Sequence, residues 1–367
     1  MKIGILTQPL HNNYGGILQN YALQTVIKRF GHEVVTIDIQ YPNKNIPIST
    51  RIVKYIWRML KWFCGDRNIL YFDLKQQLHF FNTSGKEQTR FIDSHITVEH
   101  YGSCLNKDYC NDNKYDAFVV GSDQVWRPRF SPYIPNYFLD FTEGIQVKRI
   151  SYAASFGTDC WEDCSLSTSR LASLAKLFDA ISVREKTGVR ICKDTFGVDA
   201  TWVLDPTLLL SVEDYKELYK DDNNTRKYVA VYILDESQST KTLVNEICKK
   251  LKIEPLFLGI PTKNGYPSIE SWLCGIFKSQ FVITDSFHGT VFSILGHKQF
   301  ATIVNAGRGA SRFESLLGSL NLIDRIVADN YNKVLSDIID YTSVDSLLVE
   351  YRKHSLEFLK QALDGNK

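Results

Sequence analysis

The chain lacks the long apolar segments that mark membrane-spanning and secreted proteins. None of its apolar runs reaches the roughly eighteen residues that a helix needs to cross a bilayer. Residues 1–6 are too short and turn polar too soon to serve as the start of a signal peptide. From these absences we expect a cytoplasmic protein that does not span a membrane.

Net charge and paired cysteines are also scarce. The formal net charge is only +2, which argues against a general nucleic-acid-binding protein and leaves anion recognition to local clusters. None of the eight cysteines forms a CxxC pair, and the closest two, Cys160 and Cys164, have no histidine nearby. We interpret the cysteines as reduced thiols and expect no structural metal site.

Two common ligand and catalytic motifs are missing as well. The first glycine-rich turn, which contains Gly15 and Gly16, does not follow the GxGxxG pattern of dinucleotide-binding proteins. Ser155 precedes Phe156 and Gly157 but lacks the GxSxG elbow of a hydrolase nucleophile. The sequence therefore predicts neither a dinucleotide site at the first turn nor an acyl-enzyme mechanism.

Length and hydrophobic periodicity predict an α/β protein with two Rossmann-like domains. A chain of 367 residues is too long for one ordinary core, and strand-like runs alternate with helical patterns, which calls for mostly parallel sheets. The first sheet is expected to contain strands over residues 2–6, 33–39, 117–120, 149–153 and 180–183, with helices over 17–30 and 171–178. The second is expected to contain strands over 228–234, 255–258, 281–284 and 300–304, with helices over 240–251 and 290–295.

The domain junction is expected near Pro206 and the polar stretch 221–224, because proline interrupts regular structure and polar clusters mark loops. The residues after 343 have leucines and aromatic residues at helical spacing and could pack back across the junction. We therefore expect an N-terminal domain over residues 1–200 on the acceptor side, a linker region over 201–226, a C-terminal domain over 227–342 on the donor side and a final helix within 343–367.

Polar turns follow several of these strands, where ligands collect in open α/β sheets. The run 281–284 leads into His288 at an expected helix N-terminus. Histidine exchanges a proton near neutral pH, so His288 is the strongest general acid or base candidate among the turns. The alternative is a buried histidine bonded to a backbone carbonyl.

Fixed cations are expected at two other strand ends. The guanidinium of Arg184 could hold a carboxylate or a phosphate with two parallel hydrogen bonds, or it could pair with Glu185 or a neighbouring helix. Arg308 and Arg312 lie just past a strand, and the glycines at 307 and 309 would let that loop fold against a ligand. A solvated basic loop is the alternative.

Two turns in the first half of the chain suit hydroxyl recognition. The turn at residues 12–20 is rich in amide side chains, although a tight turn with a capped helix would look the same. Asp123 and Gln124 precede Trp126, whose ring is the kind of platform on which sugars stack. Asp123 could instead be a helix N-cap.

Six segments together resemble the polysaccharide pyruvyl transferase family in their order and spacing, from residue 1 to about residue 320. They are NYGGILQNYALQ at 13–24, GSDQVW at 121–126, RISYAASFG at 149–157, ISVRE at 181–185, VLDPTLL at 203–209 and TDSFHG at 284–289. The resemblance implies two Rossmann-like domains facing a cleft, as in the GT-B fold. It also implies transfer of a pyruvyl group from phosphoenolpyruvate to a sugar of a surface polysaccharide or its lipid-linked precursor, as a ketal and without a metal or other cofactor.

The same resemblance, taken with the chemistry of the residues, assigns roles within the site. Many family members carry arginine at the position of Ser286, so Arg308 or Arg312 would have to bind the second anionic group of the donor. The expected catalytic residues are His288 and Arg184, and the expected donor-binding residues are Arg308, Arg312, Ser286 and Gly289. The expected acceptor-binding residues are Asn13, Tyr14, Gly15, Gly16, Gln19, Asp123, Gln124, Trp126 and Ser155.

Two other functions fit the same fold. One is a nucleotide-sugar glycosyltransferase, although no acidic pair suited to a ribose follows the later strands. The other is a glycan-binding relative without activity, which Ser286 favours and the presence of both Arg184 and His288 disfavours.

Residues 51–63 predict an amphipathic helix. Its basic residues fall on one stripe and its apolar residues on the opposite face, with Trp57 and Trp62 at the two borders. This pattern is typical of a helix on an anionic membrane surface, and the resemblance points to acceptors carried on lipid at the inner face of the cell membrane. A helix packed on its own domain is the alternative.

Overall fold

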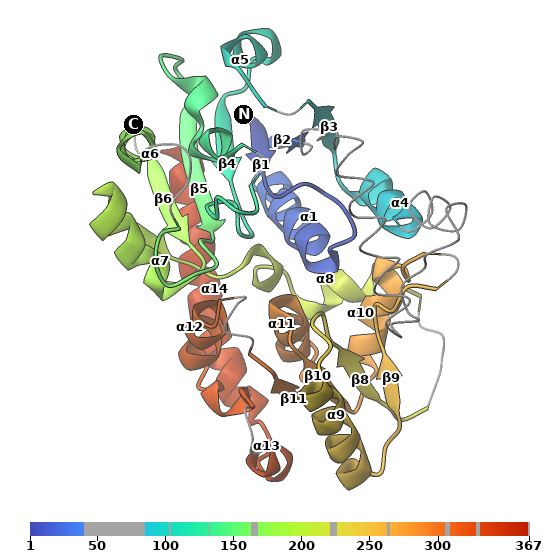
Figure 1. Ribbon diagram of the computed structural model, residues 1–367. Coiled ribbons are helices and arrows are strands. Elements are labelled where there is room, and N and C mark those ends of the chain that lie inside the picture. Colours follow the sequence, from blue (N-terminus) through green and yellow to red (C-terminus); the bar gives the residue numbers. More distant parts are fainter. Residues whose placement is uncertain are drawn as a thin grey trace, which may run out of the picture.

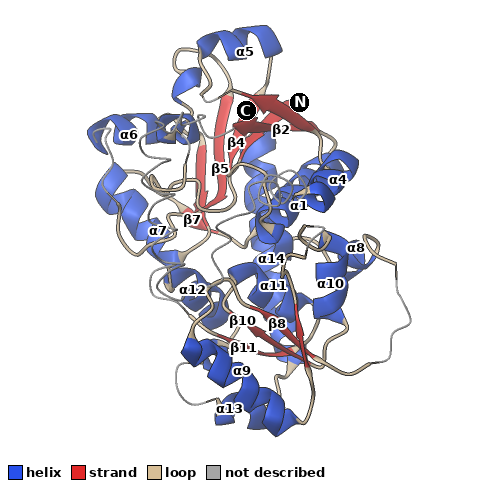
Figure 2. Cartoon of the chain, turned by 45° about the vertical axis from the view of Figure 1, so that its right-hand side comes forward, coloured by secondary structure: helices blue, strands red, loops and turns tan. Residues whose placement is uncertain are grey.

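The computed structural model describes residues 1–39, 85–102, 104–131, 133–162, 168–220, 226–262, 265–304, 309–327 and 331–365. Two of the expectations above lie outside these residues, namely the amphipathic helix at 51–63 and the role of Arg308. The described chain forms two parallel sheets stacked along the long axis of the molecule, each flanked by helices (Figure 2). The expected α/β architecture of two Rossmann-like units is confirmed.

The first sheet has seven strands in the order β3-β2-β1-β4-β5-β6-β7, and every neighbouring pair is parallel. Its central strands are apolar runs buried on both faces, as a parallel sheet between helices requires. The strands are β1 (Lys2–Leu6), β2 (Glu33–Ile39), β3 (Val98–Tyr101), β4 (Ala117–Val120), β5 (Lys148–Ala154), β6 (Ala180–Val183) and β7 (Thr201–Trp202). The accompanying helices are α1 (Tyr14–Arg29), α4 (Lys86–His95), α5 (Lys107–Asn113), α6 (Thr168–Ala175) and α7 (Lys186–Ile191).

The second sheet has four strands in the order β11-β10-β8-β9, again all parallel. Its strands are β8 (Val229–Tyr232), β9 (Pro255–Phe257), β10 (Phe281–Thr284) and β11 (Gln299–Thr302). Its helices and those that join the two units are α8 (Val212–Lys216), α9 (Gln238–Leu251), α10 (Ile269–Phe277), α11 (Phe287–Leu295), α12 (Ser311–Ser319), α13 (Asn332–Ser336) and α14 (Tyr341–Asp364).

The two units share packing at their junction. Tyr14, at the start of α1, stacks on Trp272 of α10 with ring centroids 5.6 Å apart and donates a hydrogen bond to the Pro267 carbonyl. The range expected as a linker, 201–226, begins inside the first sheet, because β7 pairs with β6. The 3₁₀ turn that follows β7, Pro206–Leu208, packs against α1 and α11.

The last helix, α14, runs from the second unit to the first (Figure 1). Near its start, the Tyr341 hydroxyl contacts the Lys298 carbonyl of the second unit. Further along, Arg352 donates to the Leu208 carbonyl at 2.7 Å, and the Ser355 hydroxyl accepts from the Leu204 backbone N–H at 3.0 Å. The helix therefore ties both sheets to the segment between them.

Candidate active site

The site lies where the carboxyl ends of both sheets face each other. The site residues follow strands at which the strand order of each sheet reverses. The reversal lies between β1 and β4 in the first sheet and between β8 and β10 in the second. Such switch points open a crevice between the loops that leave the two strands. A cavity of about 260 Å³ lies there, lined by Asn13, Asp123, Gln124, Arg127, Phe130, Leu234, Asp285, Ser286, Phe287, His288 and Arg312.

His288 sits in the first turn of α11, directly after β10. Ser286 is the N-cap of this helix, and its hydroxyl accepts a hydrogen bond from the Gly289 backbone N–H at 3.3 Å. The cap fixes the turn, so that Nε2 of His288 lies 3.6 Å from Oδ2 of Asp205. The expected helix N-terminus is therefore present, and the histidine faces a carboxylate rather than a backbone carbonyl.

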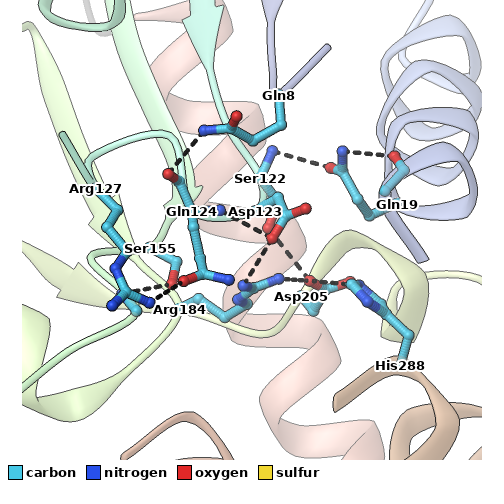
Figure 3. A network of polar contacts seen from close by, with 12 residues as sticks. Gln8, Gln19, Ser122, Asp123, Gln124, Arg127, Ser155, Arg184, Asp205 and His288 are labelled. Carbon is cyan, nitrogen blue, oxygen red and sulfur yellow. Dashed lines mark hydrogen bonds and ion pairs between the residues drawn. The ribbon is translucent and has the colours of Figure 1, made fainter. Parts of the chain in front are cut away.

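A buried charge network holds Asp205 in place (Figure 3). Arg184 donates from Nη1 to Asp205 at 2.8 Å and from Nη2 to Asp123 at 3.3 Å, and its side chain is 1% exposed. Asp205 also accepts from the backbone N–H and the hydroxyl of Thr207 at 3.0 and 2.6 Å. Ser122 Oγ donates to Asp205 at 3.2 Å and the Gln124 backbone N–H donates to Asp123 at 2.9 Å, so six hydrogen bonds converge on the two aspartates and Arg184 connects them.

The pKa values of this network follow from its burial and its opposite charges. Burial would raise the pKa of Asp205, but His288 and Arg184 outweigh it and hold that pKa well below its usual range. Burial would lower the pKa of Arg184, yet Asp205, Asp123 and Glu185 raise it above its ordinary value. Both groups are therefore charged at neutral pH, and each depends on the other.

Two more arginines line the cavity, Arg127 from the first unit and Arg312 from α12. Arg127 is paired with Glu162 at 2.9 Å and donates to the Gln124 side chain at 3.0 Å. Burial, together with the neighbouring Arg184, lowers the pKa of Arg312 to about 10. Its positive charge is thus both buried and close to a second cation.

Phe287 separates the two arginines that lie closest to His288. The guanidinium carbons of Arg184 and Arg312 lie 4.7 and 5.8 Å from the centre of its ring. Both contacts are cation–π interactions, so the ring of Phe287 stabilises two positive groups at the same time.

Gly15 is adjacent to the imidazole of His288. A Cβ atom at this position would lie 2.0 Å from Nδ1 and 2.3 Å from Cγ of the ring, which is too close for any side chain. The glycine at the start of α1 therefore serves to let the histidine approach the first unit. The expected anion or sugar contact at Gly15 is replaced by this packing against His288.

We expect Gly15→Ala to lower turnover by on the order of 100-fold, because displacing a reacting group by about 1 Å has that effect. Gly318→Ala in α12 is the matched control, since a Cβ there meets nothing within 4 Å. Turnover and melting temperature of both variants test the point. A Gly15→Ala protein with the turnover of the Gly318→Ala protein would contradict the packing argument.

The structure brings only part of the expected acceptor-binding set to the cavity. Asn13, Asp123 and Gln124 line it, and Asp123 is not a helix N-cap, because a turn rather than a helix follows it. Tyr14, Gly16, Gln19 and Ser155 are buried among other groups instead. Gln19 donates to the Thr7 hydroxyl at 2.8 Å, and the Ser155 hydroxyl donates to Glu185 at 3.0 Å.

Trp126 is not the sugar platform that the sequence suggested. Its side chain is 1% exposed, its ring stacks on Phe138 at 5.2 Å, and its Nε1 donates to the Tyr137 carbonyl at 2.8 Å. A ring enclosed in the core in this way has no free face for a sugar, so the residue belongs to the packing beneath the site.

The expected donor-binding residues also divide into two groups. Arg312 and Ser286 line the cavity, whereas the backbone N–H of Gly289 is taken up by the helix cap. Gly309 lies against the first unit, where a Cβ would meet the Gly157 carbonyl oxygen at 2.1 Å. Gly309 therefore approaches the backbone that follows β5, and Arg312, three residues later, lines the cavity.

Sequence reasoning missed several residues of the site, and Asp205 and Arg127 are the two that carry charge into its network. Asp205 lies in VLDPT, a segment that belongs to the resemblance. Its neighbour Pro206 indicated a domain junction, so no role in the site was predicted for Asp205. Arg127 directly follows GSDQVW and could have been found from that position. Arg184, which was expected to bind an anion, lies behind the lining and contacts the two aspartates.

The described residues contain no group of three or more histidine, cysteine, aspartate or glutamate side chains placed to hold a metal ion. Every cysteine in the described ranges is a free thiol. No helix within them has both the length and the apolar character needed to cross a membrane.

Solved structures share the fold at very low sequence identity. UDP-GlcNAc 2-epimerase from Methanocaldococcus jannaschii, in complex with UDP-GlcNAc and UDP, matches with a TM-score of 0.51 and 12% identity, over 100% of both chains. UGT89C1 from Arabidopsis thaliana, complexed with UDP-L-rhamnose, matches with a TM-score of 0.53 and 9% identity, over 98% of both chains. These similarities confirm the GT-B-like architecture. No curated protein matches the chain significantly.

The family model of polysaccharide pyruvyl transferase matches residues 13–307. This range contains Asn13 and Gly15 of the first unit, Arg184 and Asp205 of the buried network, and His288 of the second unit. The matched stretch therefore includes the strand ends from both sheets that build the cavity. The chain belongs to the polysaccharide pyruvyl transferase family.

Proposed function

We propose that the protein transfers the pyruvyl group of phosphoenolpyruvate to two hydroxyls of a sugar, forming a pyruvate ketal and releasing phosphate. One observation carries the proposal: a histidine paired with a buried carboxylate faces a cavity that also holds Arg312. A proton donor and an anion-binding cation in one small cavity are what an enol phosphate requires.

Arg312 is the donor-binding residue in this proposal. It lines the cavity, and the lowered pKa of its side chain means that a bound carboxylate or phosphate would stabilise the charge. Arg127 borders the same cavity, where the carboxylate of Glu162 pairs with it at 2.9 Å. Arg184 is assigned a positioning role, because its two terminal nitrogens are occupied by Asp205 and Asp123.

His288 is the general acid. The carboxylate of Asp205 lies 3.6 Å from Nε2 and stabilises the imidazolium by its charge, while Nδ1 lies on the other side of the ring beside Gly15. The imidazolium gives a proton to the methylene carbon of the donor, which becomes a methyl group. The adjacent carbon acquires oxocarbenium character and forms a bond to the first sugar hydroxyl, whose proton returns to His288.

The second half of the reaction expels phosphate. The bond between the central carbon and the phosphate oxygen breaks, and the second sugar hydroxyl bonds to the same carbon to close the ketal. The proton of that hydroxyl leaves with the phosphate as hydrogen phosphate. Two hydroxyl protons are thereby accounted for, one in the new methyl group and one on phosphate, and no oxidant or further reactant is needed.

The acceptor sugar is placed on the first unit. Asn13 and Gln124 present amide groups to the cavity, and Asp123 presents a carboxylate that Arg184 holds in position. Amide and carboxylate groups are suited to accept and donate hydrogen bonds to hydroxyls. The cavity thus offers the donor and the acceptor opposite walls.

An assay for phosphate release from phosphoenolpyruvate, supplied with candidate sugar acceptors, tests the proposal. We expect release that depends on both substrates, and a raised donor KM in Arg312→Lys, because lysine keeps the charge but loses the planar fork. Arg312→Ala should lose more. Consumption of a nucleotide sugar without any phosphoenolpyruvate-dependent release would instead support a glycosyltransferase.

A further inference from the structure

Arg127 lines the catalytic cavity, yet most of its hydrogen bonds go to Glu162. Nε of Arg127 donates to both carboxylate oxygens of Glu162 at 3.2 Å, and Nη2 donates to one of them at 2.9 Å. The guanidinium carbon also lies 4.5 Å from the ring centre of Phe130. Arg127 is therefore held in one orientation by a fork of hydrogen bonds and by an aromatic ring.

The remaining nitrogen of this guanidinium fixes the side-chain amide of Gln124. Nη1 of Arg127 donates to Oε1 of Gln124 at 3.0 Å (Figure 3). Because a guanidinium only donates, the amide atom that faces it is the oxygen and cannot be the nitrogen. None of the described residues accepts a hydrogen bond from Nε2 of Gln124. Since Gln124 lines the cavity, its NH₂ group is the part of the amide that remains for a ligand.

The rest of Gln124 is fixed as well. Its backbone N–H donates to Oδ1 of Asp123 at 2.9 Å, and its carbonyl accepts from Nε2 of Gln8 at 2.8 Å. Gly157 lies against the amide, where a Cβ atom would meet Oε1 of Gln124 at 2.0 Å. A side chain at residue 157 would displace the amide oxygen, so this orientation requires glycine there. The backbone and the side chain of Gln124 are thus in place before a ligand binds.

We propose that Arg127 and Glu162 are positioning residues that hold Gln124 with its amide NH₂ group toward the cavity, so that Gln124 donates a hydrogen bond to the substrate. The sugar then presents at this point an oxygen that accepts, such as a hydroxyl or a carbonyl oxygen. A protonated amine is rejected there, because it has only donors. The identity of the ligand as a sugar rests on the proposed function, whereas the positioning of Gln124 does not.

The mobility of the Gln124 amide tests the positioning without any substrate. In the full chain labelled with nitrogen-15, the NH₂ signal of Gln124 is identified by its absence in Gln124→Met. We expect an order parameter near the value of about 0.85 that is typical of rigid groups in wild type, and below about 0.6 in Arg127→Met and in Glu162→Gln. The first variant removes the donor to Oε1, and the second removes the charge that holds this donor.

Glu162→Gln keeps the test decisive if loss of the buried Arg127 is not tolerated, because Glu162 is 29% exposed. Glu143→Gln is the matched control. It alters the partly exposed ion pair of Glu143 with Arg170, outside the cavity lining, and should leave the Gln124 signal unchanged.

Two changes at Gln124 test the direction of the hydrogen bond in the phosphate-release assay. Gln124→Met removes the donor without adding charge, and Gln124→Glu replaces the NH₂ group by an oxygen that only accepts. We expect the acceptor KM to rise by roughly tenfold or more in both variants, because the substrate oxygen loses its partner. The change in kcat should be smaller, since the contact is the same before and during the reaction.

A Gln124 signal that is as rigid in Arg127→Met and Glu162→Gln as in wild type would overturn the positioning. An acceptor KM that rises in Gln124→Met but stays at the wild-type value in Gln124→Glu would show that the substrate donates, and would overturn the assigned direction. If the amide becomes mobile as expected in a protein that releases no phosphate from phosphoenolpyruvate, the result supports the positioning and contradicts the proposed function.

Discussion

Replacing His288 with alanine is expected to lower turnover by a factor of roughly 10²–10⁴, the usual contribution of a general acid. The reason is the position of the ring, which lines the cavity while its Nε2 faces Asp205 at 3.6 Å. Without the imidazole, water must protonate the methylene carbon of the donor. Steady-state rates at saturating donor and acceptor measure the effect.

The control for this substitution is His354→Ala. His354 is exposed on α14, away from the cavity lining, so its loss should leave turnover unchanged. A His288→Ala protein that is folded and turns over as fast as the His354→Ala protein would remove the histidine from the mechanism.

Replacing Asp205 with asparagine should reduce both stability and activity. The substitution leaves the guanidinium of Arg184, which is 1% exposed, with one carboxylate instead of two. Removing one partner of a buried ion pair costs roughly 3–5 kcal/mol of unfolding free energy, and we expect the lower end because Asp123 remains. Urea unfolding measures this loss, and Asp199→Asn, which alters only an exposed pair with Lys193, should not change it.

The pH dependence of that stability separates a charge effect from simple loss of packing. The pKa of Asp205 is depressed in the folded protein, so its contribution is complete at neutral pH and is lost as the pH falls through the ordinary carboxyl range towards the depressed value. Wild type should therefore lose more stability than Asp205→Asn between about pH 5 and about pH 3. Parallel losses in the two proteins would contradict the charged pairing of Asp205 and Arg184.

Much of the fold could be predicted from hydrophobic periodicity. The strands over 33–39, 117–120, 180–183 and 281–284 have the predicted bounds, because each is a buried apolar run between polar turns. The short strand β7 could not be predicted in the same way. It has two residues, both half-buried, and it forms because β6 offers a free edge.

The histidine of the candidate site could be predicted from the sequence, whereas its carboxylate partner could not. His288 stood out because an apolar strand and a helix N-cap flank it in sequence. Asp205 did not, because its partners are 21 and 83 positions away and only the fold brings them together. The prediction that Trp126 binds a sugar was wrong, because a tryptophan beside polar residues in the sequence can lie in the core as well as on a binding surface.

Gly15 illustrates what a sequence cannot convey about glycine. In the sequence it belongs to a turn that could approach a ligand, and in the structure it allows a histidine from the other unit to approach. The two readings require the same residue for the same reason, which is the absence of Cβ. Only the identity of the neighbour differs.

The central claim is that His288 protonates the methylene carbon of phosphoenolpyruvate while the pyruvyl group is transferred to a sugar. The most direct measurement is the reaction in deuterium oxide, followed by NMR and mass analysis of the product methyl group. The account predicts a pyruvate ketal whose methyl group carries one deuterium, formed by wild type and strongly reduced in His288→Ala. A product without deuterium in its methyl group, or a product that forms at the same rate in both proteins, would contradict it.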